Sequence, residues 1–291
     1  MVGRLEEAVE VYEQYTELRP GNPLGYLELG FGYEEEGDLR KAIASWERIE
    51  LSLIDFIEAG KRKLEIGNFD SAITWFQTAV LSFPQTADAN YELGMAYQKG
   101  QHWAHAILAY DMALAQGAFQ NVHLGDVYYQ KGLIYQSAPE FTDIAQAFAM
   151  YDAALETGAF SSAFIHANGY YKRGEIYLWM NDHLEEAISD FQQAITLYPM
   201  HYLAHLRLGY TMYQASGDVQ QAEAEILRAI ELWPNLNQKE WPYRVLGEIY
   251  EAADWTDKAI AAYQEALNIN PEDTKAQLSL KRLQGNSQEQ P

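Results

Sequence analysis

Cysteine is absent from the 291 residues, and so is any apolar run long enough to cross a bilayer. Without cysteine the chain forms no disulfide and performs no thiol chemistry. The lack of cysteine does not by itself identify the cellular compartment. A membrane-spanning helix needs about 20 consecutive apolar residues, and no stretch approaches that length. The first residues, MVGRLEEAVEVY, show the pattern of an amphipathic helix and not that of a secretory signal. We therefore expect no direct membrane insertion and a cytoplasmic protein.

Basic residues are scarce. The chain has 20 Lys and Arg against 42 Asp and Glu, which gives a net charge of −22. A field of that sign repels phosphate backbones and anionic lipid surfaces, so nucleic acid is not an expected partner. The charge is also uneven, because residues 71–170 hold only eight acids and two bases and are rich in Tyr and Phe.

Sequence motifs for catalysis are missing as well. Gly60-Lys61 lacks the upstream glycine and the following Ser or Thr of a phosphate-binding loop. The sequence contains neither a Gly-x-Ser-x-Gly elbow nor a His-Glu-x-x-His pair. We expect no enzymatic activity and no cofactor.

Two histidine pairs have the spacing of residues that share a helix face, His102 with His105 and His201 with His205. A zinc site needs a third protein ligand and an oriented outer shell, and neither is fixed near these pairs by the sequence. The favoured interpretation is that they cap helices or lie half-buried, so no metal is expected. A metal-dependent enzyme that uses His201 and His205 is the disfavoured alternative.

What the sequence does contain is a repeated pair of amphipathic helices, written most clearly in Trp241–Pro271. Apolar or small residues recur three and four apart in both halves of this segment, which is the period of a helix with one buried face. Gly247 and Ala259 are small enough for the two backbones to approach closely, while Tyr250 and Tyr263 fill the space beside them.

The small residue of the second helix recurs along almost the whole chain. Its copies are Ala8, Ala42, Ala72, Ala106, Ala147, Ala187, Ala222 and Ala259. The small residue of the first helix recurs in step, as Gly30, Gly60, Gly94, Gly132, Gly174, Gly209 and Gly247. A register kept this often predicts a stack of similar helix pairs.

This pattern resembles the tetratricopeptide repeat, whose unit of about 34 residues places an aromatic, Leu-Gly, Tyr, Ala, an aromatic and Pro at fixed offsets. The resemblance implies an all-α, right-handed superhelical solenoid of antiparallel helix pairs. We expect a single solenoid over residues 1–285, with about seven full repeats, an N-terminal half repeat and a C-terminal capping helix. The expected bounds are 1–20 for the half repeat, then 23–52, 53–86, 87–121, 122–162, 163–200, 201–236 and 237–271, with the cap at 272–285 and a disordered tail at 286–291.

We call the repeated second-helix alanines the anchor alanines. The first of them, Ala8, has no first helix before it, so we expect the chain to be a fragment of a longer protein. The alternative is that its first helix is an unusual cap. Two central units are longer than the rest, and each has Gly-Ala-Phe where other units have a closing proline. Phe119 and Phe160 of these loops either tuck under the loop or meet a partner, and burial is the favoured interpretation.

The resemblance further implies that first helices line an inner wall. Side chains expected there are Leu27, Phe31, Tyr91, Met95, Tyr129, Leu133, Tyr171, Glu175, Tyr210, Tyr213 and Arg244. Any one of them could equally pack against a neighbouring helix. Together they form an aromatic groove that suits a peptide or a protein segment, centred on Tyr91, Tyr129 and Tyr171.

Members of the family that clamp the terminal carboxylates of heat-shock chaperones present Lys and Asn at these positions. Here the positions are mostly apolar or aromatic, so a partner of that kind is not expected. The predicted function is a non-enzymatic protein-interaction scaffold. The alternative is a soluble appendage of a larger enzyme or membrane-associated assembly protein, with catalysis elsewhere, and a homo-oligomer through the central loops is also left open.

Overall fold

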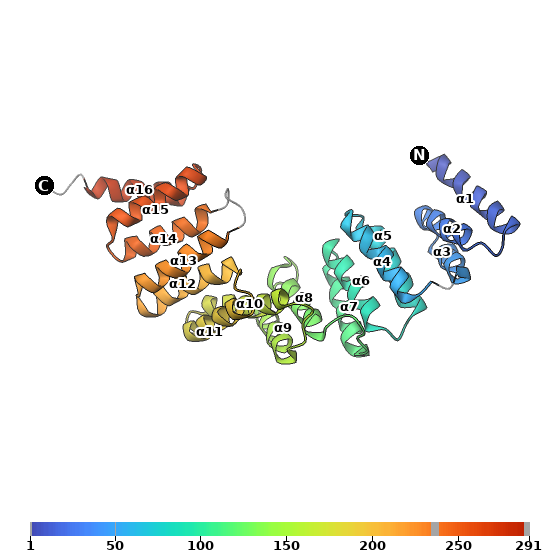
Figure 1. Cartoon of the computed structure of the whole chain (residues 1–291), viewed down its shortest axis with the longest axis horizontal. Helices are drawn as coiled ribbons and strands as arrows, with labels where there is room; N and C mark the ends of the chain where they lie inside the picture. Colours follow the sequence, from blue (N-terminus) through green and yellow to red (C-terminus); the bar gives the residue numbers. More distant parts are fainter. Residues whose placement is uncertain (1, 50, 234–238, 288–291) are drawn as a thin grey trace. The chain divides into compact units, whose positions relative to one another are not determined.

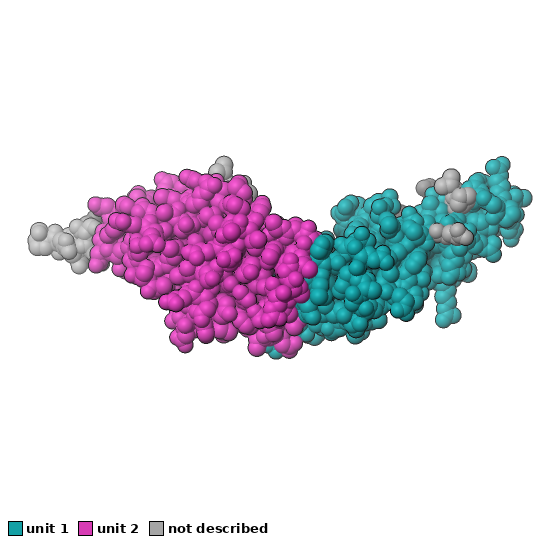
Figure 2. Space-filling view, turned by 60° about the horizontal axis from the view of Figure 1, so that its bottom comes forward, with its two compact units in different colours: residues 1–143 teal, residues 144–291 magenta. Residues whose placement is uncertain are grey.

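The computed structural model describes residues 2–49, 51–233 and 239–287, and these residues form helices and the turns between them. The chain divides into two compact units, Met1–Asp143 and Ile144–Pro291, which Figure 2 colours separately. Each unit is a stack of helices with a core of its own.

The N-terminal unit holds eight α-helices and one short 3₁₀ helix in its described residues. They are α1 (Val2–Leu18), α2 (Pro23–Glu36), α3 (Leu39–Trp46), η1 (Glu47–Ile49), α4 (Leu53–Glu65), α5 (Phe69–Ser82), α6 (Ala87–Lys99), α7 (Trp103–Gln116) and α8 (Leu124–Ser137). First and second helices pack against each other in the pairs α2–α3, α4–α5 and α6–α7 (Figure 1).

The C-terminal unit also holds eight α-helices in its described residues. They are α9 (Ile144–Thr157), α10 (Ala163–Met180), α11 (Leu184–Leu197), α12 (Tyr202–Ser216), α13 (Val219–Leu232), α14 (Glu240–Ala252), α15 (Thr256–Ile269) and α16 (Thr274–Ser287). Here the pairs are α10–α11, α12–α13 and α14–α15, and α16 packs against α15 as the predicted cap (Figure 1).

Close backbone approach at the small residues explains the pairing, as the register predicts. A β-carbon placed on Gly247 would lie 2.7 Å from the Tyr263 ring, and one placed on Gly209 would lie 2.7 Å from the carbonyl oxygen of Ala222. The anchor alanines Ala106 and Ala259 are fully buried. The predicted all-α architecture of antiparallel helix pairs is confirmed.

Three turns between paired helices combine a left-handed glycine with a helix-capping Asp or Asn. Gly37, Gly67 and Gly217 have positive φ, and Asp38, Asn68 and Asp218 cap the helices that follow. At Gly100-Gln101, however, the left-handed residue is Gln101, with φ of 62°. Gly100 ends α6 with an ordinary negative φ, so its freedom is not what this turn needs.

Side chains of different helices contact one another within each unit. In the N-terminal unit Trp46 stacks on Trp75 with centroids 4.2 Å apart, which ties α3 to α5. In the C-terminal unit the guanidinium of Arg173 on α10 donates two hydrogen bonds to Asp190 of α11 and a third to Asp152 of α9. The tryptophan stack thus joins two helix pairs, and Arg173 joins the pair α10–α11 to α9.

The expected repeat at 122–162 contains the last helix of one unit, α8, and the first helix of the other, α9. One continuous solenoid over residues 1–285 therefore stays a prediction. The expected tail, residues 286–291, begins inside α16, and its last four residues lie outside the described part of the chain, as does the closing proline Pro234.

Candidate functional site

The inner-wall side chains expected in the N-terminal unit lie partly in its core. Leu27 and Phe31 of α2 are half-buried, and the Phe31 ring lies 5.3 Å from the Trp75 ring. Tyr91 and Met95 of α6 are half-buried against the cluster that contains Tyr110. Each of the four therefore packs on one side and leaves part of its surface to solvent.

On α8 the two expected residues differ from each other. Leu133 is half-buried, but Tyr129 is only 8% exposed, and this burial raises the pKa of its phenol to about 12. A side chain this buried contributes to stability and offers little area to a partner. Its direct contact with a ligand stays a prediction.

In the C-terminal unit, Tyr171 of α10 is likewise only 4% exposed. Its hydroxyl donates a 2.8 Å hydrogen bond to Glu175, the next expected residue one turn along the helix. Tyr210 and Tyr213 of α12 remain half-buried. Arg244 of α14 is held by Asp273 at 3.0 Å and by Glu248 at 3.1 Å.

A charged cluster surrounds Glu175. Its carboxylate receives Lys172 Nζ at 3.0 Å and Arg207 Nη2 at 3.1 Å. Burial alone would raise the pKa of Glu175, but the two cations and the Tyr171 hydroxyl outweigh it and hold the pKa below its usual value. The cluster therefore stays ionised and carries one net positive charge inside an acidic protein.

Sequence reasoning missed Lys172, Arg207 and Trp241 as surface features. The guanidinium of Arg207 lies 5.1 Å from the centroid of the Trp241 ring, within the range of a cation–π contact. One signal was available, because Lys172 and Arg207 each stand two residues before the first-helix glycine of their pair, Gly174 and Gly209. Both contact Glu175, so this position also contributes to the expected wall in the pairs α10–α11 and α12–α13.

Only the pair His201 and His205 is taken up by packing. His102 and His105 are exposed, and His102, at the N-cap of α7, makes no side-chain cap hydrogen bond, so the expectation that this pair caps a helix or lies half-buried is wrong. His205 Nδ1 lies 2.7 Å from Glu225 and its Nε2 lies 3.2 Å from the carbonyl oxygen of Pro199, so both ring nitrogens are engaged. His201 Nδ1 accepts the N–H of Ala204 as a helix cap. Among the residues that the structure describes, no cluster of three or more His, Asp or Glu side chains is placed to hold a metal.

The enlarged loop after α7 is anchored by a carboxylate that the sequence did not point to. Asp88 of α6 is 1% exposed and accepts the N–H of Gln120 at 3.1 Å and that of Asn121 at 2.8 Å. Phe119 packs against the adjacent core, so it is tucked under its loop. Phe160 of the second long loop stacks on His166 with centroids 4.4 Å apart.

No described helix is both long and apolar enough to cross a membrane. No curated protein matches the sequence. The solved structures that resemble the chain are helical repeat proteins at low identity. PilF of Pseudomonas aeruginosa matches with a TM-score of 0.63 and 16% identity over 80% of this chain and 97% of its own.

Two further structures match at similar levels. PilW, a type IV pilus biogenesis factor, has a TM-score of 0.61 and 14% identity over 78% of this chain and 98% of its own. YrrB, described as a TPR protein with an unusual peptide-binding site, has a TM-score of 0.57 and 18% identity over 71% of this chain and 97% of its own. At these identities the likeness concerns the fold alone.

Sequence profiles give the family directly. One tetratricopeptide repeat profile matches residues 57–121 and 171–237, and a second matches residues 2–22 and 243–273. Together the matched segments cover more than half of the sequence. The chain belongs to the tetratricopeptide repeat family.

Proposed function

We propose that this chain is a non-enzymatic scaffold that binds a segment of a partner protein along the side chains of its first helices. Proteins of this family are generally non-catalytic and bind proteins or peptides. The observation that carries the proposal is the half-buried state of the wall residues Phe31, Met95, Leu133, Tyr210 and Tyr213. Each is fixed on one side by packing and open on the other, so little side-chain entropy is lost when a partner covers it.

The first helices of the C-terminal unit also carry polar anchors of their own. Lys172 and Arg207 are partly exposed and held in place by Glu175. Such pre-oriented donors suit a carboxylate or a backbone carbonyl of a bound segment. YrrB, a structural neighbour, is described as binding peptide, which is compatible with this use of the fold.

Tyr129 and Tyr171 are poor choices for a test, because alanine at such buried positions leaves a cavity and destabilises the protein by about 3 kcal/mol or more. Alanine at a half-buried position removes contact area for a partner with little loss of stability, so the effect on binding can be measured apart from the effect on folding. Peptides that bind the chain would be selected from a displayed random library. Their dissociation constants would be measured by fluorescence anisotropy. The variants are Met95→Ala and Tyr210→Ala, with Met112→Ala on the second helix α7 as an exposed control.

We expect one or both wall variants to weaken the selected peptide at least tenfold with an unchanged melting temperature, and Met112→Ala to have no effect. If binding withstands both wall variants, or falls only with Met112→Ala, the wall is not the binding surface. The proposal is then wrong as to site.

A further inference from the structure

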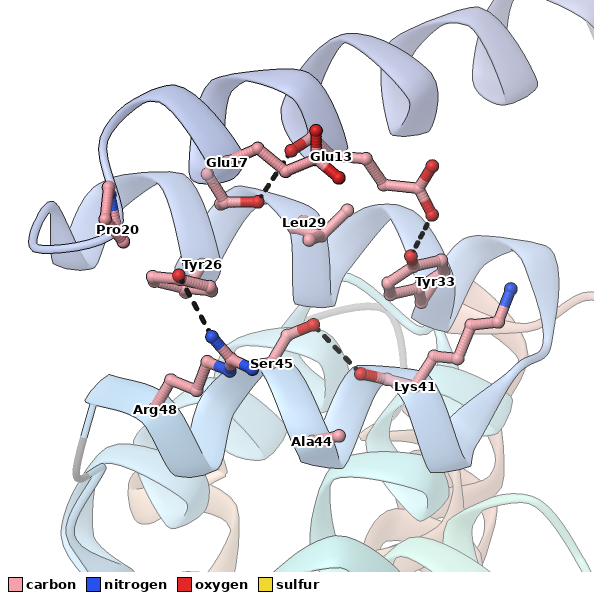
Figure 3. A pocket seen from close by; sticks show the side chains of 11 residues that line it. Glu13, Glu17, Pro20, Tyr26, Leu29, Tyr33, Lys41, Ala44, Ser45 and Arg48 are labelled. Carbon is pink, nitrogen blue, oxygen red and sulfur yellow. Dashed lines mark hydrogen bonds between the residues drawn. The ribbon is translucent and has the colours of Figure 1, made fainter.

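A cleft of about 550 Å³ opens on another side of the N-terminal unit, between α1 and α3, with α2 as its floor (Figure 3). The floor is formed by Tyr26 and Tyr33 together with Leu29. At 3.6 residues per turn these side chains point more than about 90° away from Leu27 and Phe31 on the same helix. The cleft is therefore separate from the wall described above.

The basic residues of the cleft contact its aromatic floor. Arg48 of η1 lies 5.3 Å from the centroid of the Tyr26 ring and donates a 3.2 Å hydrogen bond to the hydroxyl of the same tyrosine. The ammonium of Lys41 on α3 lies 4.9 Å from the centroid of the Tyr33 ring and 3.8 Å from Asp38, and its side chain is 58% exposed. Both cations therefore stay on their own side of the cleft and keep donors open to its space.

The opposite wall, on α1, is acidic. Glu13 accepts a hydrogen bond from the Tyr33 hydroxyl, and Glu17 lines the cleft one turn further along (Figure 3). Burial, followed by the hydrogen bond to Glu13, raises the pKa of Tyr33 well above its usual value, so the hydroxyl keeps the proton that it donates. Glu10 and Glu6 continue the same helix face toward the N-terminus.

No ion pair crosses this cleft among the side chains described for α1, α3 and η1. Glu13 has the Tyr33 hydroxyl as a partner, but among these described side chains neither Glu13 nor Glu17 has a cation across the cleft, and the cleft has the size of an ordinary ligand pocket. Along the helix axis Glu13 and Glu17 are about 6 Å apart. Alternate residues of an extended chain are about 6.8 Å apart and point to the same side.

We propose that this cleft binds an extended basic segment of a partner protein, with Lys or Arg at alternate positions directed at Glu13 and Glu17. The backbone carbonyls of that segment accept hydrogen bonds from Lys41 and Arg48. An acidic segment is repelled by α1, and the net charge of −22 steers basic chains toward the protein. The match in charge and in spacing carries this assignment, which stands apart from binding at the inner wall.

The test uses the full chain and a fluorescein-labelled, end-blocked hexapeptide of alternating lysine and serine, measured by anisotropy at low salt. The double variant Glu13→Gln/Glu17→Gln is compared with Glu265→Gln/Glu272→Gln, which removes the same charge from exposed positions of the C-terminal unit. We expect the cleft variant to weaken binding at least tenfold and the control less than twofold. Equal losses in the two variants would mean general attraction to an acidic protein and would overturn the proposal.

Spacing is tested separately with a hexapeptide of the same composition whose three lysines are consecutive. We expect it to bind at least threefold more weakly than the alternating peptide, and equal binding would overturn the extended geometry. Because Glu13 also receives the Tyr33 hydroxyl, the double variant could lose stability. The single variant Glu17→Gln leaves that bond intact and must still weaken binding at least threefold, or the cleft is not the site.

Discussion

Gly94 on α6 lies so close to the ring of Tyr110 on α7 that a β-carbon on the glycine would be 2.5 Å from Cε1 of the tyrosine. Real β-carbons do not approach other atoms this closely, so the helix pair needs glycine here. The ring itself is fully buried, and its hydroxyl donates a 2.7 Å hydrogen bond to Gln98. It therefore has little room to move aside.

Replacing Gly94 by alanine should lower the free energy of unfolding by about 1–3 kcal/mol, as overpacking of a core does. Alanine is the better helix former by about 1 kcal/mol, so a net loss isolates the cost of the clash. Urea unfolding followed by circular dichroism measures it. The matched control is Gly285→Ala within the helix α16, where an added β-carbon meets nothing within 4 Å; a similar loss there would contradict the explanation.

Asp88 should control the loop that follows α7. The variant Asp88→Ala removes the acceptor for the N–H groups of Gln120 and Asn121, at a cost of about 1–3 kcal/mol. The direct measurement is hydrogen exchange, in which both amides should exchange at least tenfold faster. Glu140→Ala, at an exposed position, should leave them unchanged. Unaltered protection in Asp88→Ala would show that the loop is held by other contacts.

Glu34 should make the N-terminal unit less stable as the pH rises. The carboxyl is 9% exposed, and burial, outweighing Lys63, Trp75 and Ser71, raises its pKa from 4.5 to about 7. Between these values the folded chain holds a proton that the unfolded chain has released. The free energy of unfolding therefore falls across this window, by about 2 kcal/mol.

Urea unfolding at pH 5 and pH 8 measures this effect. In Glu34→Gln the fall between the two pH values should shrink by about 2 kcal/mol. The exposed neighbour variant Glu35→Gln should keep the original fall. A fall of the same size in Glu34→Gln would assign it to other groups.

His201 should act in the opposite direction at acid pH. It is 4% exposed, and burial is the main reason that its pKa drops from 6.5 to about 4. Between pH 6.5 and 4 the unfolded chain binds a proton that the folded chain does not, so stability is lost as the pH falls through this range. His201→Asn keeps an acceptor for the Ala204 N–H but cannot titrate.

Comparison of the two proteins at pH 7 and pH 5 is the measurement. The wild-type chain should lose about 1–2 kcal/mol more than His201→Asn on acidification. Hydrogen exchange of α12 amides localises the effect. Equal losses would show that the buried imidazole is not responsible.

Sequence alone determined the helices, their order and the small residues at which they meet. These features depend on the local period of apolar residues and on side-chain size. Gly94 shows them in the pair α6–α7, and Gly247 with Ala259 in the pair α14–α15. The turn glycines Gly37 and Gly217 are local features as well, because the left-handed backbone at these points is one that glycine adopts without strain. The left-handed φ of Gln101 is not marked in this way, since it is set by the surrounding turn and not by the preference of the residue.

Only the tertiary structure decided how much of each wall side chain is exposed to solvent. Tyr129 and Tyr171 have the same helical register as Tyr91, yet they are nearly buried, because burial depends on the helices packed around each of them. The Asp88 anchor joins residues more than 30 positions apart, and the cleft between α1 and α3 depends on how far two second helices stand from each other. A periodic sequence specifies the contacts inside a helix pair, but not the space that packing leaves between that pair and the next helix.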